Sequence, residues 1–140
     1  MKTTNKFQKF IDLAYALFDP AHSPRTFHVS FILYKNRIIS IGINNAKTTP
    51  VNLLNPKYGK DGQNISGIKG SCSEWVAISK MKNMTNIRFC KSILVNVRLN
   101  RNKIIDVSRP CHSCQSLIRF LNLKKVFFTN KHGLFEEYKI

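Results

Sequence analysis

Two short motifs decide how this chain folds: Cys72-Ser73-Glu74 and, farther along, Pro110-Cys111-His112-Ser113-Cys114. The first motif precedes an apolar stripe at helical spacing that reaches Met81, and the second precedes a similar stripe that reaches Leu121. Pro110 suits the first turn of a helix, where its missing N–H costs nothing. Two helix starts are therefore expected to present three cysteines and one carboxylate.

The chemistry of these four side chains points to a catalytic zinc site. Three thiolate ligands leave one coordination position open, whereas structural zinc sites are closed by four ligands. An open position admits a water molecule that zinc acidifies, and Glu74 is placed to accept its proton. We predict that Cys72, Cys111 and Cys114 hold the zinc. The alternative is a structural four-cysteine site completed by Cys90, which begins a predicted strand and is better interpreted as a small core residue.

Periodicity predicts the remaining elements. Residues from about 4 to 18 have the pattern of an amphipathic helix, and residues 27–34 and 38–43 have that of a hairpin of two antiparallel strands. Further strands are expected at 93–99, 126–129 and 134–140. The link before the last strand is too short for a parallel crossover, so the last strand should run antiparallel to its neighbour. Residues 45–70 lose periodicity and collect Pro and Gly, which indicates a functional loop or a partly disordered segment.

Composition favours one domain spanning residues 1–140 and an anionic partner. A chain of 140 residues with 43% hydrophobic content can build one core, and no apolar run is long enough to span a bilayer, so we expect an intracellular, cytoplasmic protein without a membrane partner. Lys and Arg total 23 against 7 acidic residues, a formal net charge of +16. Such an excess predicts a phosphate-bearing partner or substrate. The alternative is an ordinary solvated basic surface.

The two motifs resemble the signature of the cytidine and deoxycytidylate deaminase superfamily, H-x-E followed by P-C-x-x-C, with Cys in place of His in the nucleoside branch. The resemblance covers most of the chain, and Lys47-Thr48-Thr49-Pro50 also resembles a motif of some viral deaminase-like proteins. It implies an α/β fold of three layers, a five-stranded mixed sheet with helices on both faces. It also implies zinc as the cofactor, no organic cofactor, and conversion of cytosine to uracil with Glu74 moving the protons. Adenine deamination uses the same machinery and stays open.

The resemblance extends to substrate contacts. It places Asn44 at the position that contacts the sugar. Nucleoside deaminases usually carry Arg directly after the Glu, where its charge tempers the thiolates, but this chain has Trp75 there. Arg109 is a candidate for that charge, with an exposed surface Arg as the alternative.

Three hypotheses for the function follow from the charge and the motifs: two differ in the substrate, and the third has no catalysis. Basic residues, Lys47, Lys57 and Lys60 among them, favour cytosine in single-stranded nucleic acid, either DNA or RNA. The Cys first ligand favours free cytidine, deoxycytidine or dCMP instead. A third hypothesis is a non-catalytic nucleic-acid-binding module that is stabilised by zinc, although a structural site has no use for Glu74. Homo-oligomer formation is compatible with each of these.

Overall fold

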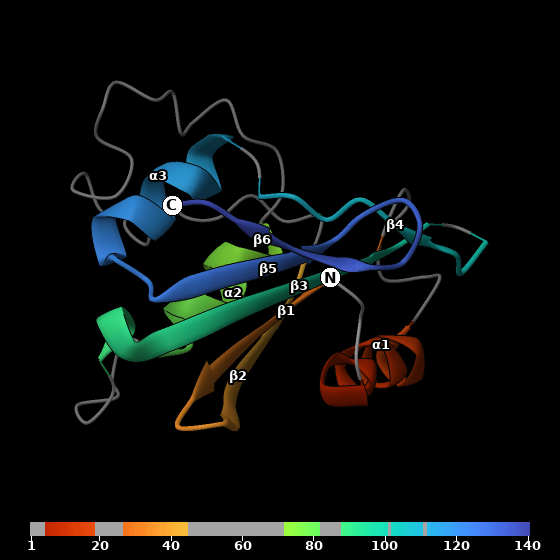
Figure 1. Ribbon diagram of the computed structural model, residues 1–140, viewed down its shortest axis with the longest axis horizontal. Helices are drawn as coiled ribbons and strands as arrows, with labels where there is room; N and C mark the ends of the chain where they lie inside the picture. Colours follow the sequence, from red (N-terminus) through yellow and green to blue (C-terminus); the bar gives the residue numbers. More distant parts are fainter. Residues whose placement is uncertain (1–4, 19–26, 45–71, 82–87, 101, 111) are drawn as a thin grey trace.

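The computed structural model describes residues 5–18, 27–44, 72–81, 88–100, 102–110 and 112–140 (Figure 1). The elements in these ranges are α1 (Asn5–Leu17), β1 (Phe27–Tyr34), β2 (Arg37–Ile43), α2 (Ser73–Ser79), the 3-10 helix η3 (Phe89–Lys91), β3 (Ser92–Leu99), β4 (Ile105–Asp106), α3 (His112–Leu121), β5 (Lys125–Thr129) and β6 (Phe135–Tyr138). None of the described helices is long and apolar enough to cross a bilayer.

The strands form one mixed sheet in the order β2-β1-β3-β5-β6, with the short β4 beside the end of β3. β1 runs antiparallel to both β2 and β3, whereas β3 and β5 are parallel. β6 runs antiparallel to β5, which confirms the prediction for the last strand. β4 was not predicted, because two residues are too few for a periodic signal.

Side chains alternate between the two faces of the sheet, as the twofold period of a strand requires. Along β3, Val95 and Val97 pack in a cluster with α1, whereas Leu94 packs in a second cluster with α2 and α3. Figure 1 accordingly shows α1 set apart from α2 and α3. The expected three-layer α/β fold, with helices on both faces of a mixed sheet, is confirmed.

Aromatic side chains attach α1 to the sheet. Phe7 lies 5.0 Å from Phe127 and 5.1 Å from Phe135 between ring centroids, and Phe10 lies 5.3 Å from Phe31. All but Phe127 are buried. Burial of a Phe side chain stabilises a fold by about 1.5–3 kcal/mol, so this cluster contributes to the attachment of α1 to the sheet.

Two local predictions were wrong in detail. The β1–β2 turn consists of Lys35 and Asn36, both with positive φ (53° and 64°) as in a two-residue type I′ turn, so Arg37 belongs to β2. Cys90 lies in η3 and is exposed, so it is not a core residue. The chain turns there through a bond from the Lys91 N–H to the Arg88 carbonyl before β3 begins.

Candidate metal centre

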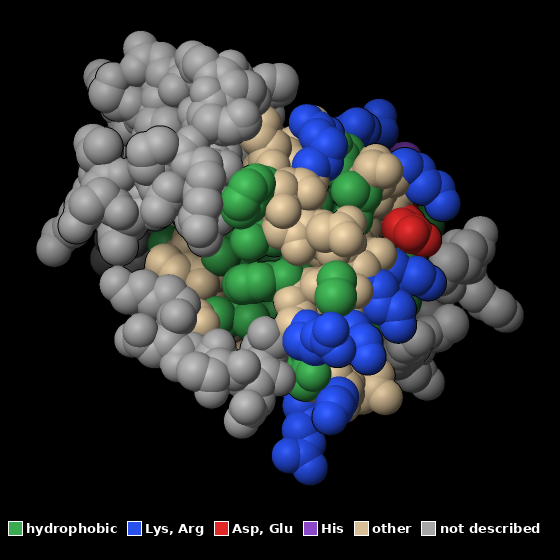
Figure 2. Space-filling view, turned by 90° about the vertical axis from the view of Figure 1, so that its left-hand side faces the viewer, with side chains coloured by type: hydrophobic (Ala, Val, Ile, Leu, Met, Phe, Trp, Pro, Cys, Tyr) green, Lys and Arg blue, Asp and Glu red, His purple; other side chains and the backbone are tan. Residues whose placement is uncertain are grey.

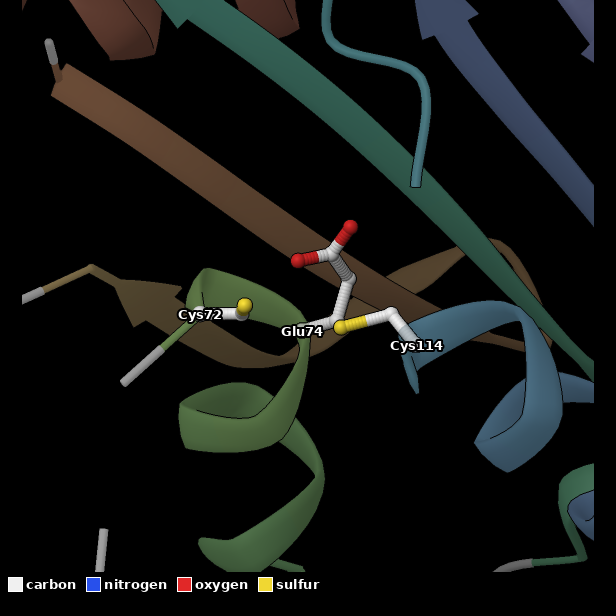
Figure 3. A group of neighbouring side chains, drawn as sticks. All are labelled: Cys72, Glu74 and Cys114. Carbon is white, nitrogen blue, oxygen red and sulfur yellow. The ribbon is translucent and has the colours of Figure 1, made fainter. Parts of the chain in front are cut away.

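The starts of α2 and α3 bring two of the predicted ligands together. Cys72 is the N-cap residue of α2, with extended backbone (φ −68°, ψ 148°), and Glu74 lies in the first turn. Cys114 lies near the start of α3. Their ligand atoms, the two sulfurs and a Glu74 carboxylate oxygen, all lie within 4.8 Å of one another (Figure 3). Glu74 and Cys114 are buried and Cys72 is half-buried.

The Glu74 carboxylate is held by hydrogen bonds to both of its oxygens. Asn96 Nδ2 on β3 donates to Oε2 at 2.8 Å, and Ser73 Oγ donates to Oε1 at 3.3 Å. Figure 3 shows the carboxylate directed toward the sheet, with the Cys72 and Cys114 sulfurs on either side of the Glu74 side chain. Glu74 is only 3% exposed, so the protein rather than bulk water fixes its position. A carboxylate held in this way is suited to proton transfer at a bound substrate.

Asn96 is itself fixed by a buried polar network. Its Oδ1 accepts a hydrogen bond from Ser30 Oγ at 2.6 Å, and Ser30 Oγ is 2.7 Å from Ser73 Oγ. Asn96 Nδ2 also donates to the Ser108 carbonyl at 3.3 Å. Ser30, Ser73, Asn96 and Ser108 are fully buried. Because an unpaired polar group in such a site costs free energy, the network specifies one arrangement of α2 against the sheet.

Ser108 connects this network to the segment that leads into α3. Its Oγ donates to the Asn96 carbonyl at 2.9 Å and lies 2.8 Å from Thr129 Oγ1 on β5. The Ser108 N–H bonds to the Thr129 carbonyl at 2.9 Å. Residues directly before the Pro110 motif are thus attached to both β3 and β5, and this attachment positions the Cys114 end of the site.

Gly42 lets α2 approach β2 closely. A Cβ built on Gly42 would lie 2.3 Å from both the Ala77 nitrogen and the Ser73 carbonyl oxygen, far inside contact distance. Ser40 Oγ, two residues earlier on β2, donates to the Ala77 carbonyl at 2.7 Å. The backbone of α2 therefore rests directly on β2, and any side chain at position 42 would displace the helix that carries Cys72 and Glu74.

The structure places the other predicted site residues as follows. Asn44 Oδ1 accepts a hydrogen bond from the His28 N–H at 2.9 Å, at the open end of the β1–β2 hairpin. Arg109 is exposed, and its guanidinium lies 5.3 Å from the centroid of the Tyr138 ring. Substrate contact by Asn44 and charge compensation by Arg109 both stay predictions. Cys111, Lys47, Lys57 and Lys60 lie outside the described residues.

Sequence reasoning missed Asn96 and Ser30. Both are polar residues inside otherwise apolar strands, and Asn is depleted in strands because its side chain fits a pleated, half-buried surface poorly. This interruption of the pattern was a signal that could have indicated a site residue. The pairing of Asn96 with Glu74 could not be inferred from it, because that pairing depends on how α2 packs.

The donor set fits a zinc ion. Two thiolates on one tetrahedral zinc lie about 3.8 Å apart, given Zn–S bonds of about 2.3 Å, and the observed grouping within 4.8 Å is close to that arrangement. Cys90 is exposed and does not belong to the group that the described residues form.

Comparison with known families agrees with the interpretation of this site as a zinc centre. The family model for the cytidine and deoxycytidylate deaminase zinc-binding region matches residues 4–130. The chain therefore belongs to this family, which binds zinc. No curated protein and no solved structure gave a significant match.

Proposed function

We propose that this protein deaminates cytosine to uracil by hydrolysis, acting on single-stranded nucleic acid. One water molecule adds to C4 of the base, the bond from C4 to the exocyclic nitrogen breaks, and ammonia leaves. The observation that carries the proposal is the buried Glu74 carboxylate, grouped with two cysteine sulfurs and oriented by Asn96. A site built only to hold a structural metal has no need of an oriented carboxylate that other side chains keep in place.

Cys72, Cys111 and Cys114 would hold the zinc, and Glu74 would move the protons. When bound, zinc supplies the Lewis acidity that makes water nucleophilic near neutral pH. Glu74 takes one proton from the attacking water and delivers it to N3 of the base. It then takes the proton of the hydroxyl group now on C4 and delivers it to the exocyclic nitrogen, which leaves as ammonia. Because Asn96 and Ser73 hold one oxygen each, the carboxylate keeps its place while the proton moves. Asn96 acts through Glu74 and is a positioning residue.

Charge favours a polynucleotide substrate over a free nucleoside. The formal net charge of +16 far exceeds what a neutral nucleoside or a single phosphate requires. Polynucleotides carry one phosphate per nucleotide and release counterions when cations bind, so a basic protein gains affinity for them. Free cytidine, deoxycytidine or dCMP is the second candidate, because the family includes enzymes named for both cytidine and deoxycytidylate.

A deamination assay on matched substrates tests this proposal. Zinc-loaded protein is incubated with cytidine, dCMP, and single-stranded DNA and RNA oligonucleotides that contain one cytosine, and uracil is quantified by mass spectrometry. We expect the highest kcat/KM on one of the two oligonucleotides. Turnover confined to cytidine or dCMP would refute the polynucleotide substrate, but it would support the hydrolytic deamination of cytosine. Oligonucleotide binding without any turnover would favour the non-catalytic binding module.

A further inference from the structure

Cationic side chains gather where several strands meet at one end of the sheet. Tyr34, the last residue of β1, pairs with Arg37 of β2 and with Ser92 of β3, and Ile93 pairs with Lys125 of β5. The β1–β2 turn and the starts of β3 and β5 are therefore neighbours. Five of the exposed cations at this end are here called the strand-end cations: Lys35, Arg37, Lys91, Lys124 and Lys125.

Acidic residues in the described part of the chain do not neutralise this end. The ion pair that the described residues form joins Lys139 to Glu137 at 3.9 Å, and it includes none of the strand-end cations. Figure 2 looks onto the side that holds the β1–β2 turn and the starts of β3 and β5. It shows Lys and Arg side chains there, next to hydrophobic ones and a much smaller acidic area. Clustered charge of one sign raises the local concentration of oppositely charged ligands.

A hollow of about 420 Å³ lies beside the strand-end cations, on the α1 side of the sheet. Its lining is mainly apolar, with the partly buried Leu33, Ile93 and Phe127 contributed by three strands. The polar side chains that line it are Lys9, Asn36 and Lys125. An apolar floor bordered by cations and one amide suits a ligand in which a flat ring is joined to an anion.

We propose that the strand-end cations and this hollow bind single-stranded polynucleotide at a second surface, away from the metal centre. Phosphates lie on the cations and an unpaired base enters the hollow, where the Asn36 amide meets its polar edge. A duplex keeps its bases stacked inside, so only a single strand presents phosphates and a free base together. β2 and β5 are three strand spacings apart, about 14 Å, which allows contact with more than one nucleotide.

This surface lies on the opposite face of the sheet from Glu74. Leu33, Ile93 and Phe127 pack with the α1 cluster, whereas Glu74 bonds to Asn96, which faces α2. A polynucleotide held here would stay attached while another part of it reaches the metal centre. The inference rests on the proposed function for the nature of the substrate, but binding at this surface is measurable without deamination.

The test uses a fluorescent oligothymidylate of about 20 nucleotides, which contains no cytosine, and measures its dissociation constant across a salt series. The test variant is Lys91→Gln with Lys124→Gln. The matched control, Lys103→Gln with Lys131→Gln, removes the same charge from turns near the opposite ends of β3 and β5. For single strands the salt slope is about 0.7 per phosphate contact, so the test variant should lose roughly 1.4 from the magnitude of the slope.

We expect the control to keep the slope of the unmodified protein, a duplex of equal length to bind several-fold more weakly, and an abasic strand to bind several-fold more weakly too. An equal decrease of the salt slope in both double variants would overturn the proposal, since it would show an effect of net charge alone. Equal binding of duplex and single strand would also overturn it, as would binding of phosphatidylserine vesicles in preference to the oligonucleotide. Binding at this surface by a protein that deaminates only free cytidine would refute the polynucleotide substrate but not this surface.

Discussion

Asn96 Nδ2 on β3 donates a hydrogen bond of 2.8 Å to Glu74 Oε2 on α2. The bond joins the middle of the sheet to the helix that carries one sulfur of the metal centre. Asn96 in turn is fixed through its own oxygen by Ser30 Oγ at 2.6 Å. The position of the carboxylate therefore depends on the sheet and not on α2 alone.

Replacement of Asn96 by Asp should lower the rate without loss of metal. The new carboxylate keeps an oxygen for Ser30 but offers Glu74 a like charge in place of a donor. A hydrogen bond to a charged group contributes about 1.5–3 kcal/mol, so kcat should fall by roughly 10- to 100-fold while KM and zinc content stay near their original values. Steady-state kinetics and metal analysis check this result.

Thr129→Val is the control for Asn96→Asp. It removes a hydroxyl that bonds to Ser108 and to the Asp106 carbonyl, in the same network but without contact to Glu74. We expect a loss of about 1–3 kcal/mol in the free energy of unfolding. The kcat should change little, because the backbone bond from the Ser108 N–H to the Thr129 carbonyl still attaches this segment to β5. If kcat fell equally in both variants, the role assigned to Asn96 would be structural only.

Gly42→Ala should displace α2 and weaken zinc binding. The added methyl group would meet the backbone of Ser73 and Ala77 at 2.3 Å, and backbone cannot rotate away as a side chain can. Overpacking of this kind typically costs about 1–3 kcal/mol. Chelator competition and thermal unfolding measure the two effects.

The control for Gly42→Ala is Gly133→Asn, in the β5–β6 turn. Gly133 has φ of +80°, which Asn tolerates better than most residues, and a Cβ there would meet only the Ile105 side chain at 3.6 Å. We expect this variant to keep its zinc affinity. An unchanged zinc affinity in Gly42→Ala as well would mean that α2 does not depend on this close approach.

Single Cys→Ser variants should separate the ligands from the remaining cysteine. We expect Cys72→Ser, Cys111→Ser and Cys114→Ser each to lose most of the zinc, because serine is a poor ligand for this metal. Cys90 is exposed in η3, so Cys90→Ser should keep one zinc per chain. Zinc loss in Cys90→Ser equal to that in Cys111→Ser would instead indicate a structural site with four ligands.

Much of the fold could be predicted because its elements have strong periodicity. The alternation in β1 and β3 and the helical stripe of α1 each reflect burial against one neighbour, so their bounds agree with the structure to within one or two residues. The start of β2 was predicted one residue too late, because Arg37 pairs with Tyr34 only through the type I′ geometry of Lys35 and Asn36. Turn conformation depends on φ angles that a hydrophobic pattern does not encode.

The metal centre could be predicted in part. Cys72, Glu74 and Cys114 were indicated by their spacing and by the requirements of zinc chemistry, and the structure brings them together. Asn96, Ser30 and Ser108 were not identified, because each is near its partner only after β1, β3 and α2 have packed. In the sequence, the only sign of such long-range hydrogen bonds is an unexpected polar residue within an apolar strand.

The most direct test of the account is the Glu74→Gln variant, assayed for uracil formation on whichever substrate the unmodified protein prefers. Glutamine has nearly the shape of glutamate, and its oxygen can still accept the hydrogen bond from Asn96, so fold and zinc content should persist. Proton transfer is lost, and such roles are worth about 10²–10⁴ in rate. The account predicts one zinc per chain in both proteins and a rate reduced by at least about a hundredfold in the variant. A zinc-loaded variant within a few-fold of the unmodified rate would contradict it.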